Sequence, residues 1–406
     1  MIDYQYKARD KSTGRIISGV ISADNEMSAG KLLIKQEMYP IQLKAKKGSV
    51  LGTGSETGKV KLKDRVVFTR QMSTLVKAGL PIATALNSSM SQVSNKKLQN
   101  IIFRMTKSVE GGTPFSEALA EYPENFNKIY ISLIQAGEAS GNLEVTMERL
   151  ANQLEKEAEI NSKVRGALIY PAVVMVVILL VMGFMMSSVL PQIIELYKSF
   201  NKPLPWITQV LKGVSTVFIS YWYLVFPILG AMGYGAYRYV KTPNGGRVMD
   251  RAKITLPPFN QLFLKMYMAR FARTLGSLTA SGIPILESLR LVGESMNNSI
   301  LQAEVVLMAD QVKSGKSLSE TLVKTEYFLP LVGQMVKVGE DSGTMGDMLD
   351  RLATFYENEV DQQIKNISTL IEPVLIVFLG LMVMLIIIGI LFPVYSLVGQ
   401  DLSGGK

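Results

Sequence analysis

The chain has 406 residues, with 43 lysines and arginines against 34 aspartates and glutamates, and it contains neither histidine nor cysteine. These counts exclude a Ser-His-Asp triad, a thiolate nucleophile, a disulfide, an iron–sulfur cluster and a zinc site built on histidine or cysteine. Only hard cations held by carboxylate oxygens remain among the metals. The net charge of +9 is compatible with an anionic membrane surface, an acidic partner or nucleic acid.

The first 46 residues are predicted to form a small α+β unit. Alternating residue types over 2–6 and the apolar-rich run 16–21 predict a hairpin. A helix is expected over 24–36, and residues 41–44 would return as a third strand.

A flexible linker is predicted over 47–61, because this segment is rich in Gly, Ser and Lys. The basic residues Lys59, Lys61, Lys63 and Arg65 have no aromatic residues between them. This pattern favours a solvated linker, or docking on a membrane surface or protein partner, over nucleic-acid binding. No nucleic-acid partner is therefore predicted.

The chain repeats itself at an offset of about 203 residues. Seven of the 19 positions from 68 to 86 are identical to those 203 residues later, which is far above chance. These identities pair Phe68, Arg70, Leu75, Gly79, Pro81, Ile82 and Leu86 with Phe271, Arg273, Leu278, Gly282, Pro284, Ile285 and Leu289. The match continues at Gly112 with Gly315 and, after a slip of one residue, at Gly137, Glu138, Ser140 and Gly141 with Gly339, Glu340, Ser342 and Gly343.

Each copy is predicted to be a bundle of roughly six helices, given its length of about 100 residues and common helix lengths. Gly79 and Gly282 fit the position after a helix end, where φ is positive. Pro81 and Pro284 fit the first turn of the next helix. The further predicted breaks are Gly112 with Gly315, and Gly137–Gly141 with Gly339–Gly343.

Three uncharged runs are predicted to cross a membrane. Residues 168–190 and 373–398 are long enough to span the hydrocarbon layer. The third run, 214–237, is rich in Tyr and Gly and has aromatic residues that suit a membrane interface. Pro227 is expected to kink this helix, which neighbouring helices can accommodate. Prolines 20 residues apart bracket the two matched spans, namely Pro171 with Pro191 and Pro373 with Pro393.

The charge distribution predicts the sidedness of these spans. Basic residues before the first span and after the second favour a cytoplasmic N-terminus under the positive-inside rule. The first 15 residues have no apolar core and carry charge from Asp3 onward, so they are not expected to be a signal peptide. Each repeat copy ends in one apolar run, so a second copy in the same orientation needs a return helix, which the unmatched run 214–237 supplies.

The predicted fold class is a mainly α membrane protein with two repeated cytoplasmic helical-bundle domains, three transmembrane helices and a small α+β N-terminal unit. The predicted segments are the N-terminal unit (1–46), linker (47–61), first helical domain (62–167), first transmembrane helix (168–190), external loop (191–213), second transmembrane helix (214–237), second helical domain (238–369), third transmembrane helix (370–398) and external tail (399–406).

No catalytic, cofactor-binding or metal-ligating residue is predicted. Gly137–Gly141 differs in residue order from a nucleophile elbow, and no histidine is present to activate its serine. Gly315-Lys316-Ser317 resembles the end of a phosphate-binding loop, but Asp310 stands where that loop needs a glycine.

The matched residues are predicted instead to be structural or partner-contact positions. Two roles stay open for Arg70 with Arg273 and for Glu138 with Glu340: salt bridges or interface contacts, and solvated helix ends or internal caps. The complete candidate set is Arg70, Gly79, Pro81, Gly112, Gly137, Glu138, Gly141, Arg273, Gly282, Pro284, Gly315, Gly339, Glu340 and Gly343, with Pro171, Pro191, Pro373 and Pro393 as membrane-span brackets.

Over almost its whole length, the chain resembles the type II secretion system F family, which includes general secretion pathway protein F and type IV pilus assembly protein C. The resemblance lies in the Tyr-x-Tyr-Lys-Ala-Arg segment (Tyr4 to Arg9), both copies of Phe-x-Arg-(x)4-Leu-(x)3-Gly-x-Pro, the Gly-Glu-x-Ser-Gly turns, the proline-bracketed spans and Glu372-Pro373. The combination is specific, whereas each piece alone is weak.

The resemblance implies a non-enzymatic platform in the bacterial inner membrane, with a cytoplasmic N-terminus and an external C-terminus. Its helical domains would bind a hexameric cytoplasmic assembly ATPase, and it would help to move pilin or pseudopilin subunits from the bilayer into a filament. Other inner-membrane assembly proteins and further copies of the chain are the remaining implied partners, besides the lipid bilayer. No cofactor is implied.

Two other functions fit the sequence less well. A transporter or channel component is disfavoured because no charged residue lies in the runs 168–190, 214–237 or 373–398. A membrane-embedded Ser–Lys hydrolase is disfavoured because these runs contain no lysine to activate a serine. The sequence leaves open whether the machine assembles pili, secretes proteins or builds a related filament, and it does not fix the oligomeric state.

Overall fold

The computed structural model describes residues 2–10, 16–23, 26–35, 38–45, 59–199, 204, 206–257, 259–391 and 395. Two compact units divide the chain, Met1–Leu154 and Glu155–Lys406. Most of the predicted linker, the bracket residue Pro393 and the predicted tail at 399–406 lie outside the described residues.

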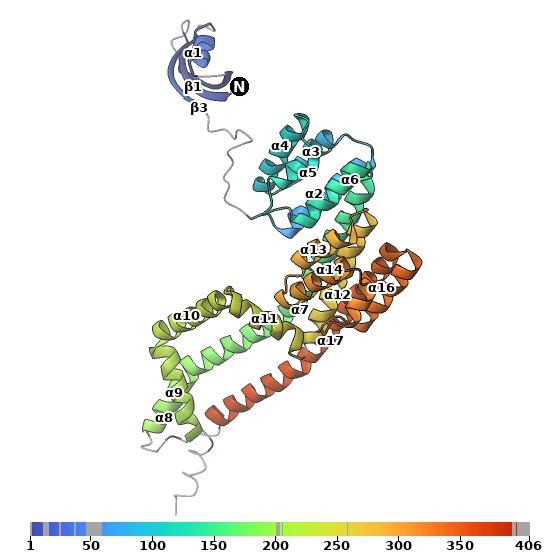
Figure 1. Cartoon of the computed structure of the whole chain (residues 1–406). Helices are drawn as coiled ribbons and strands as arrows, with labels where there is room; N and C mark the ends of the chain where they lie inside the picture. Colours follow the sequence, from blue (N-terminus) through green and yellow to red (C-terminus); the bar gives the residue numbers. More distant parts are fainter. Residues whose placement is uncertain are drawn as a thin grey trace, which may run out of the picture. The chain divides into compact units, whose positions relative to one another are not determined.

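The N-terminal residues form a three-stranded antiparallel sheet and one helix (Figure 1). Strand β1 (Ile2–Asp10) pairs with β2 (Ile16–Ala23) along one edge and with β3 (Met38–Ala45) along the other. Helix α1 (Glu26–Lys35) contributes buried Ala29 and Leu33. Both edges of the central strand are therefore hydrogen-bonded, as the order β2-β1-β3 requires.

Residues 62–184, all of which the structure describes, contain the six helices of repeat 1. They are α2 (Leu62–Lys77), α3 (Ile82–Met90), α4 (Lys96–Glu110), α5 (Phe115–Ala120), α6 (Lys128–Ser140) and α7 (Leu143–Phe184). The ring of Phe68 lies 5.9 Å from that of Phe126, which lies 5.0 Å from Tyr130. These fully or nearly fully buried rings form the centre of the bundle.

Repeat 2 has the same order of helices within 259–386. They are α12 (Phe259–Ala280), α13 (Ile285–Ser295), α14 (Ser299–Lys313), α15 (Leu318–Val323), α16 (Pro330–Ser342) and α17 (Met345–Ile386). The aromatic pair recurs as Phe271 and Phe328, whose rings are 5.0 Å apart. The sequence estimate of roughly six helices per copy agrees with this arrangement.

Glycine ends the same helices in both repeats. Among the described residues the glycines with positive φ are Gly79, Gly112, Gly141, Gly282, Gly315 and Gly343, with matched φ values of 80° and 81°, 93° and 92°, and 70° and 70°. The predicted positive φ at Gly79 and Gly282 is confirmed. Pro81 and Pro284 stand at the N-cap of α3 and α13, one residue before the predicted first turn.

The two apolar segments are continuous with the last helix of each repeat. Helices α7 and α17 both have 42 residues, and Pro171 and Pro373 each lie 28 residues after the first residue of the helix. Both prolines therefore lie inside a continuous helix, and their role as brackets of a membrane span stays a prediction. A proline inside a helix removes only one backbone donor, and a long helix can continue through it with a local kink.

A π-helical turn follows each of these helices, η1 (Met185–Val189) after α7 and η2 (Ile387–Leu391) after α17. Helix α8 (Leu190–Ser199) then continues past Pro191. The segment predicted as an external loop, 191–213, is thus helical over 191–199 and again from Trp206. The first of these turns, η1, ends two residues before Pro191. Proline has no N–H, so it cannot complete a regular ladder of helical hydrogen bonds.

The run 214–237 is two helices instead of one. Helix α9 (Trp206–Ser220) ends and α10 (Trp222–Val240) begins at Tyr221, which has φ −116° and ψ 19° (Figure 1). The sequence predicted one helix with a kink at Pro227, whereas the structure has a break at Tyr221 and α10 continues through Pro227. Three consecutive aromatic residues, which are weak helix formers, lie at the break, and Pro227 removes a backbone donor soon after it.

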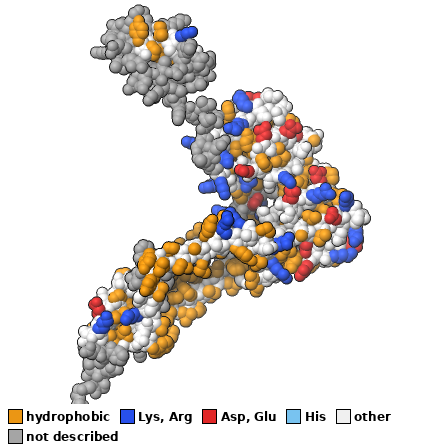
Figure 2. Space-filling view, turned by 60° about the vertical axis from the view of Figure 1, so that its left-hand side comes forward, with side chains coloured by type: hydrophobic (Ala, Val, Ile, Leu, Met, Phe, Trp, Pro, Cys, Tyr) orange, Lys and Arg blue, Asp and Glu red, His pale blue; other side chains and the backbone are white. Residues whose placement is uncertain are grey.

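Two helical segments of the described chain are long and apolar enough to cross a membrane, Leu143–Ser199 and Met345–Gly389. Their most apolar stretches are almost entirely unburied by the rest of the protein. Figure 2 shows hydrophobic side chains covering the elongated helical part, whereas charged side chains of both signs cover the helical bundles. An apolar surface this long is costly in water and suits a lipid environment.

Candidate functional site

Glu138 and Glu340 cap the same short helix in the two repeats. The carboxylate of Glu138 on α6 accepts hydrogen bonds from the backbone N–H groups of Phe115 (2.6 Å) and Ser116 (2.9 Å), at the start of α5. Glu340 on α16 accepts from Leu318 (2.7 Å) and Ser319 (3.1 Å), at the start of α15. The structure therefore shows internal caps, one of the two roles that the sequence left open, and the partner-contact role stays a prediction.

The glycines beside these glutamates allow two helices to approach closely. A β-carbon at Gly137 would lie 2.8 Å from Oγ1 of Thr146 on α7. At Gly339 it would lie 2.9 Å from Cα of Met345 on α17. The Gly-Glu-x-Ser-Gly segment thus combines a close helix contact, a cap for a second helix and a left-handed C-terminal turn at Gly141 or Gly343.

Arg273 ties α12 to α17. Its guanidinium binds both carboxylate oxygens of Glu357, each at 2.9 Å, pairs with Asp350, and donates to Oγ1 of Thr354 at 3.2 Å. Burial by itself would lower the pKa of Arg273, but Glu357 and Asp350 raise the pKa above its ordinary value. Arg70, the matched residue, donates to Asn152 on α7 at 2.5 Å. Both arginines therefore join the first helix of their repeat to the last.

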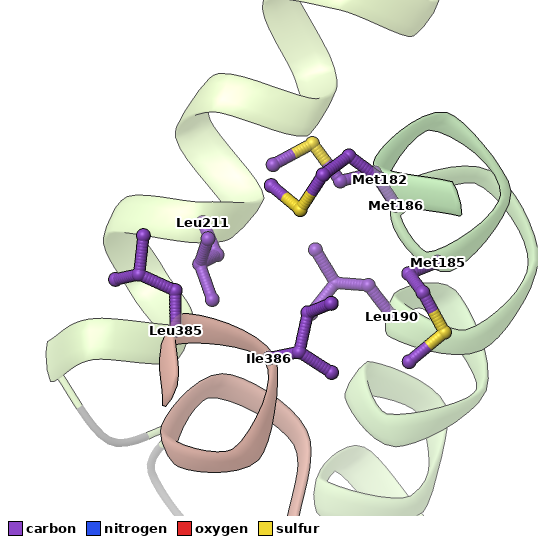
Figure 3. Close-up of a pocket in the computed structure, with 7 residues that line it drawn as sticks. All are labelled: Met182, Met185, Met186, Leu190, Leu211, Leu385 and Ile386. Atoms are coloured by element: carbon purple, nitrogen blue, oxygen red, sulfur yellow. The ribbon is translucent and has the colours of Figure 1, made fainter. Parts of the chain in front are cut away.

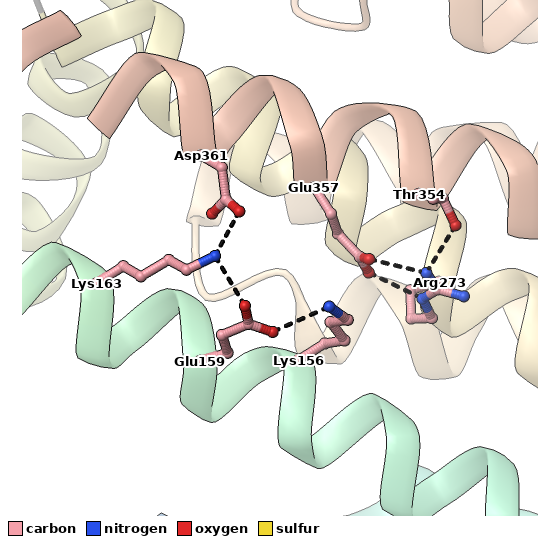
Figure 4. Close-up of polar contacts among 7 residues, drawn as sticks. All are labelled: Lys156, Glu159, Lys163, Arg273, Thr354, Glu357 and Asp361. Carbon is pink, nitrogen blue, oxygen red and sulfur yellow. Dashed lines mark hydrogen bonds and ion pairs between the residues drawn. The ribbon is translucent and has the colours of Figure 1, made fainter. Parts of the chain in front are cut away.

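A second set of ion pairs joins α7 to α17 (Figure 4). Lys163 on α7 pairs with Asp361 on α17 and with Glu159 at 2.8 Å, and Glu159 also pairs with Lys156 at 2.9 Å. Hydrogen bonds from Lys163 and Lys156 lower the pKa of Glu159 to about 2. Asp361 thus connects a helix of repeat 2 to the last helix of repeat 1.

Helix α12 contacts both of these long helices. Lys265 pairs with Glu359 on α17 at 2.6 Å, and Arg270 approaches Glu157 on α7 to 3.5 Å. Beside the ion pairs lies an apolar cluster drawn from all three helices, namely Leu262, Val360, Ile364 and Ile367, with Ile160, Val164, Ala167, Met266 and Ile371 packed against it. We call this cluster and its ion pairs the junction.

The junction lies directly before the apolar runs that begin near residues 168 and 373. Sequence reasoning missed it, because a helix face that contacts another repeat has no local signature. The closest signal is the mixed charge of 155–165 and 357–365, which also fits a solvated helix.

At the other end of the apolar helices, α9 contacts both π turns. The hydroxyl of Ser215 donates to the carbonyl of Met186 in η1 at 3.1 Å, and that of Thr208 donates to the carbonyl of Gly389 in η2 at 3.3 Å. Ser215 and Thr208 are seven residues apart and so lie on one face of α9. Hydroxyl donors of this kind satisfy backbone carbonyls that irregular helical turns leave free in an apolar environment.

A small apolar cavity of about 20 Å³ lies between these elements (Figure 3). Its lining consists of Met182, Met185, Met186, Leu190, Leu211, Leu385 and Ile386. A cavity of this size and chemistry has no polar partner to hold water. The flexible side chains of its three methionines, all from the end of α7 and η1, allow the surface to repack around another apolar helix.

Repeat 1 carries a wider and polar groove of about 450 Å³. Lys97, Asn100, Ile101 and Arg104 of α4 form one wall, and residues 121–125 form the other. The positions of repeat 2 that match Ile101 and Arg104 are Glu304 and Leu307. Two lining positions of the groove therefore differ in residue type between the repeats.

The described residues contain no group of three or more aspartate and glutamate side chains that could hold a metal ion. The matched residues of the two repeats are joined by turns, caps and helix contacts, and they do not gather into one pocket.

The chain is similar to known proteins over nearly its full length. The family model described as Type II secretion system (T2SS), protein F, matches residues 68–191 and 271–393, and the model of the N-terminal domain of the same protein matches residues 1–44. The first two matched segments coincide with the two repeats.

Curated relatives carry the names of two machines. A type IV pilus assembly protein PilC from Thermus thermophilus is 36% identical over 402 residues, which cover 98% of each chain. A PilC from Myxococcus xanthus is 32% identical over 399 residues, covering 98% of this chain and 95% of the relative. A type II secretion system protein F from Xanthomonas campestris is 32% identical over 401 residues, covering 97% and 98%. The chain belongs to the type II secretion system protein F family.

Proposed function

We propose that this protein is a non-enzymatic platform in the bacterial inner membrane, at the base of a type IV pilus or a type II secretion machine. It couples a cytoplasmic assembly ATPase to the insertion of pilin or pseudopilin subunits into a filament. The observation that carries the proposal is the pair of 42-residue helices α7 and α17, each of which belongs to a helical bundle at one end and is apolar and unburied at the other.

A rigid helix is suited to this role because a displacement of its soluble end is transmitted along its axis. The junction supports this coupling. It holds α7 and α17 together where the apolar runs begin, through packed side chains and ion pairs. A movement imposed on one bundle therefore reaches both apolar helices.

The proposed topology has three crossings, with a cytoplasmic N-terminus and an external C-terminus. α7 and α17 cross outward, and α9 and α10 together return the chain. The chain has no native cysteine, so single cysteines report sidedness cleanly. Glu110 and Asp310 are exposed residues of the two bundles, and Lys198 is an exposed residue of α8.

A membrane-impermeant maleimide added to intact cells tests this topology. It is expected to label Lys198→Cys and to leave Glu110→Cys and Asp310→Cys unlabelled until the cells are opened. Labelling of only one of the two bundle positions in intact cells would place the repeats on opposite faces, and the proposed function would then fail.

The groove of repeat 1 is our proposed contact for the ATPase. Arg104 is exposed in this groove, and Lys107 is also exposed on the same helix, outside the groove. In co-purification of the full chain with the assembly ATPase, Arg104→Glu is expected to lower recovery of the ATPase at least several-fold, whereas Lys107→Glu retains it. Equal recovery with both variants would remove the groove from the proposal.

Pilus assembly and secretion are both represented among the relatives, so the machine is identified by the effect of deleting the gene. Loss of surface pili with normal export of proteins assigns pilus assembly, and the reverse result assigns secretion. We expect the protein to act as a homo-oligomer beside other inner-membrane assembly proteins, which cross-linking in native membranes tests.

A further inference from the structure

Helix α11 (Pro243–Thr255) follows α10 directly and packs on repeat 2 by one face. Ile254 is buried on that face, and Gly245 is buried at the start of the helix against Tyr239 of α10. The hydroxyl of Thr242 caps the new helix by accepting the N–H of Gly245 at 3.1 Å. A β-carbon at Gly245 would lie 2.0 Å from the carbonyl oxygen of Tyr239, so the chain turns tightly between the two helices. The end of α10 therefore sets the position of α11.

The only acidic side chain of α11 is committed to repeat 2. Asp250 accepts hydrogen bonds from the N–H and hydroxyl of Ser299, at 2.9 and 3.0 Å, and pairs with Lys253 at 3.1 Å. Burial by itself would raise the pKa of Asp250, but the hydrogen bonds from Ser299 and Lys253 hold the pKa below its ordinary value. The negative charge of Asp250 therefore stabilises the start of α14, and it does not neutralise the arginines on the outer face of α11.

The outer face of α11 combines arginine with apolar side chains. Arg247 and Arg251 are exposed and lie four residues apart, which places them on the same side of the helix. Val248 lies between them and is 60% exposed, and Leu256 extends the exposed apolar surface beyond the end of the helix.

Two further cations stand at the end of α10. Arg238 and Lys241 are exposed, and the ammonium of Lys241 lies 4.4 Å from the centre of the Tyr237 ring. Over the described part of the chain, none of Arg238, Lys241, Arg247 and Arg251 forms an ion pair within the protein. Figure 2 shows Lys and Arg side chains gathered where the hydrophobic surface of the long helices ends.

We propose that the outer face of α11 lies on the anionic cytoplasmic surface of the membrane and binds the phosphates of acidic phospholipids. The inference rests on the membrane location in the proposed function and adds a lipid-binding surface to it. Arginines interleaved with exposed valine and leucine fit the boundary between headgroups and acyl chains, where each part of the surface finds a complementary environment.

The preceding residues favour lipid over an acidic protein. Tyr234, Tyr237 and Tyr239 at the end of α10 are all exposed. Tyrosines are enriched at membrane interfaces, because the ring is apolar and the hydroxyl is polar. Only three residues separate this group from helix α11, so its arginines lie at the depth of the phosphates.

The depth of α11 is measured on the full chain with a nitroxide label at Val248→Cys. Leu307→Cys on α14 is the matched control, because Leu307 is also 60% exposed. Leu180→Cys in the apolar part of α7 reports whether the protein is in the membrane at all. The chain is reconstituted into vesicles of phosphatidylethanolamine and phosphatidylglycerol, or of phosphatidylcholine alone.

In the anionic vesicles the label at 248 is expected to be accessible to oxygen and protected from an aqueous nickel chelate, whereas the label at 307 stays in water. The protection is expected to weaken in phosphatidylcholine. Arg247→Gln and Arg251→Gln are each expected to lower the ratio of immersed to water-exposed label about fivefold, in line with the effect of one basic residue near an anionic surface.

Equal water access at 248 in both kinds of vesicle would overturn the lipid proposal while leaving the proposed function intact, provided that the label at 180 is immersed. Protection at 248 that appears only on addition of an acidic partner protein would also overturn it. A label at 180 that stays in water would overturn the membrane location, and with it both proposals.

Discussion

Single side chains account for why the two repeats keep the same sequence at a few positions. Glu138 and Glu340 each satisfy two backbone N–H groups of a helix that begins more than 20 residues earlier. The N-terminus of a helix carries unsatisfied donors and a partial positive charge, so a carboxylate there is favoured on both counts. At the C-terminal ends of helices, the six described glycines with positive φ allow the left-handed turn that ends the helix.

Glu138→Ala is expected to lower the free energy of unfolding by about 1–2 kcal/mol, because two N–H groups of α5 lose their acceptor. Thermal unfolding of the purified full chain in detergent measures the loss. Glu117→Ala, on the exposed side of the same helix, is the control and is expected to change the midpoint much less. Equal shifts would show that Glu138 contributes only its charge.

Glu304 predicts a dependence of stability on pH. Burial, and then the charge of Glu326, raise the pKa of Glu304 to about 7. Between pH 4.5 and 7 the folded protein therefore keeps a proton that the unfolded chain has already released. The free energy of unfolding falls as the pH rises through this range. One carboxylate oxygen of Glu304 is buried without a hydrogen-bond partner among the described residues.

Glu304→Gln is expected to stabilise the chain at pH 8 by about 1 kcal/mol, after allowance for solvent screening of a half-buried group, and to have little effect at pH 5. Unfolding midpoints at the two pH values measure the difference. Glu287→Gln, an exposed change on α13, serves as the control. An equal gain at both pH values would contradict the titration of Glu304.

Among the helices, the unduplicated elements connect what the duplication left separate. Helix α9 donates hydroxyl hydrogen bonds to the π turn that follows each long helix. Helix α11 returns the chain to repeat 2 through a tight turn and caps α14 with Asp250. These elements lack a counterpart in the other copy, so their side chains are free to match two different neighbours.

Gly245→Ala tests the turn between α10 and α11. The added β-carbon meets the backbone carbonyl of Tyr239, which cannot move without opening the turn, and the expected loss of stability is about 2 kcal/mol or more. Gly246→Ala is the matched control, because its nearest backbone atom is 3.4 Å away. Thermal unfolding that does not distinguish the two variants would show that the turn opens at little cost.

For the whole molecule, the division between compact units falls inside α7, between Leu154 and Glu155. The first part of this helix belongs to the bundle of repeat 1, and the second part packs with α12 and α17 of repeat 2. One helix thus takes part in both units. This sharing gives the proposed coupling a physical route, since α7 has no break between its two environments.

Ile364→Ala removes part of the apolar cluster in the junction, where this side chain is 8% exposed. The expected cost is about 2–4 kcal/mol, from lost burial and the cavity that remains. Ile376→Ala on the same helix is the control, since Ile376 is exposed in the apolar segment.

If the junction transmits motion, Ile364→Ala lowers filament assembly or secretion in cells more than it lowers the amount of protein in the membrane. Activity that follows protein amount alone would assign the junction a structural role only. Ile376→Ala is expected to retain both.

The sequence by itself determined the repeat, the apolar runs and the ends of the bundle helices. Each of these features is set by a short stretch of sequence. A turn with positive φ requires a glycine at that position, and a long uncharged run is apolar whatever the fold around it. The tertiary structure alone decided the reach of Glu138 to α5, the junction between repeats and the contacts of α9 with both π turns. These join residues from about 20 to more than 180 positions apart, and no local pattern specifies the partner. The break at Tyr221 was also missed, because the local preference of a single residue is weak beside tertiary packing.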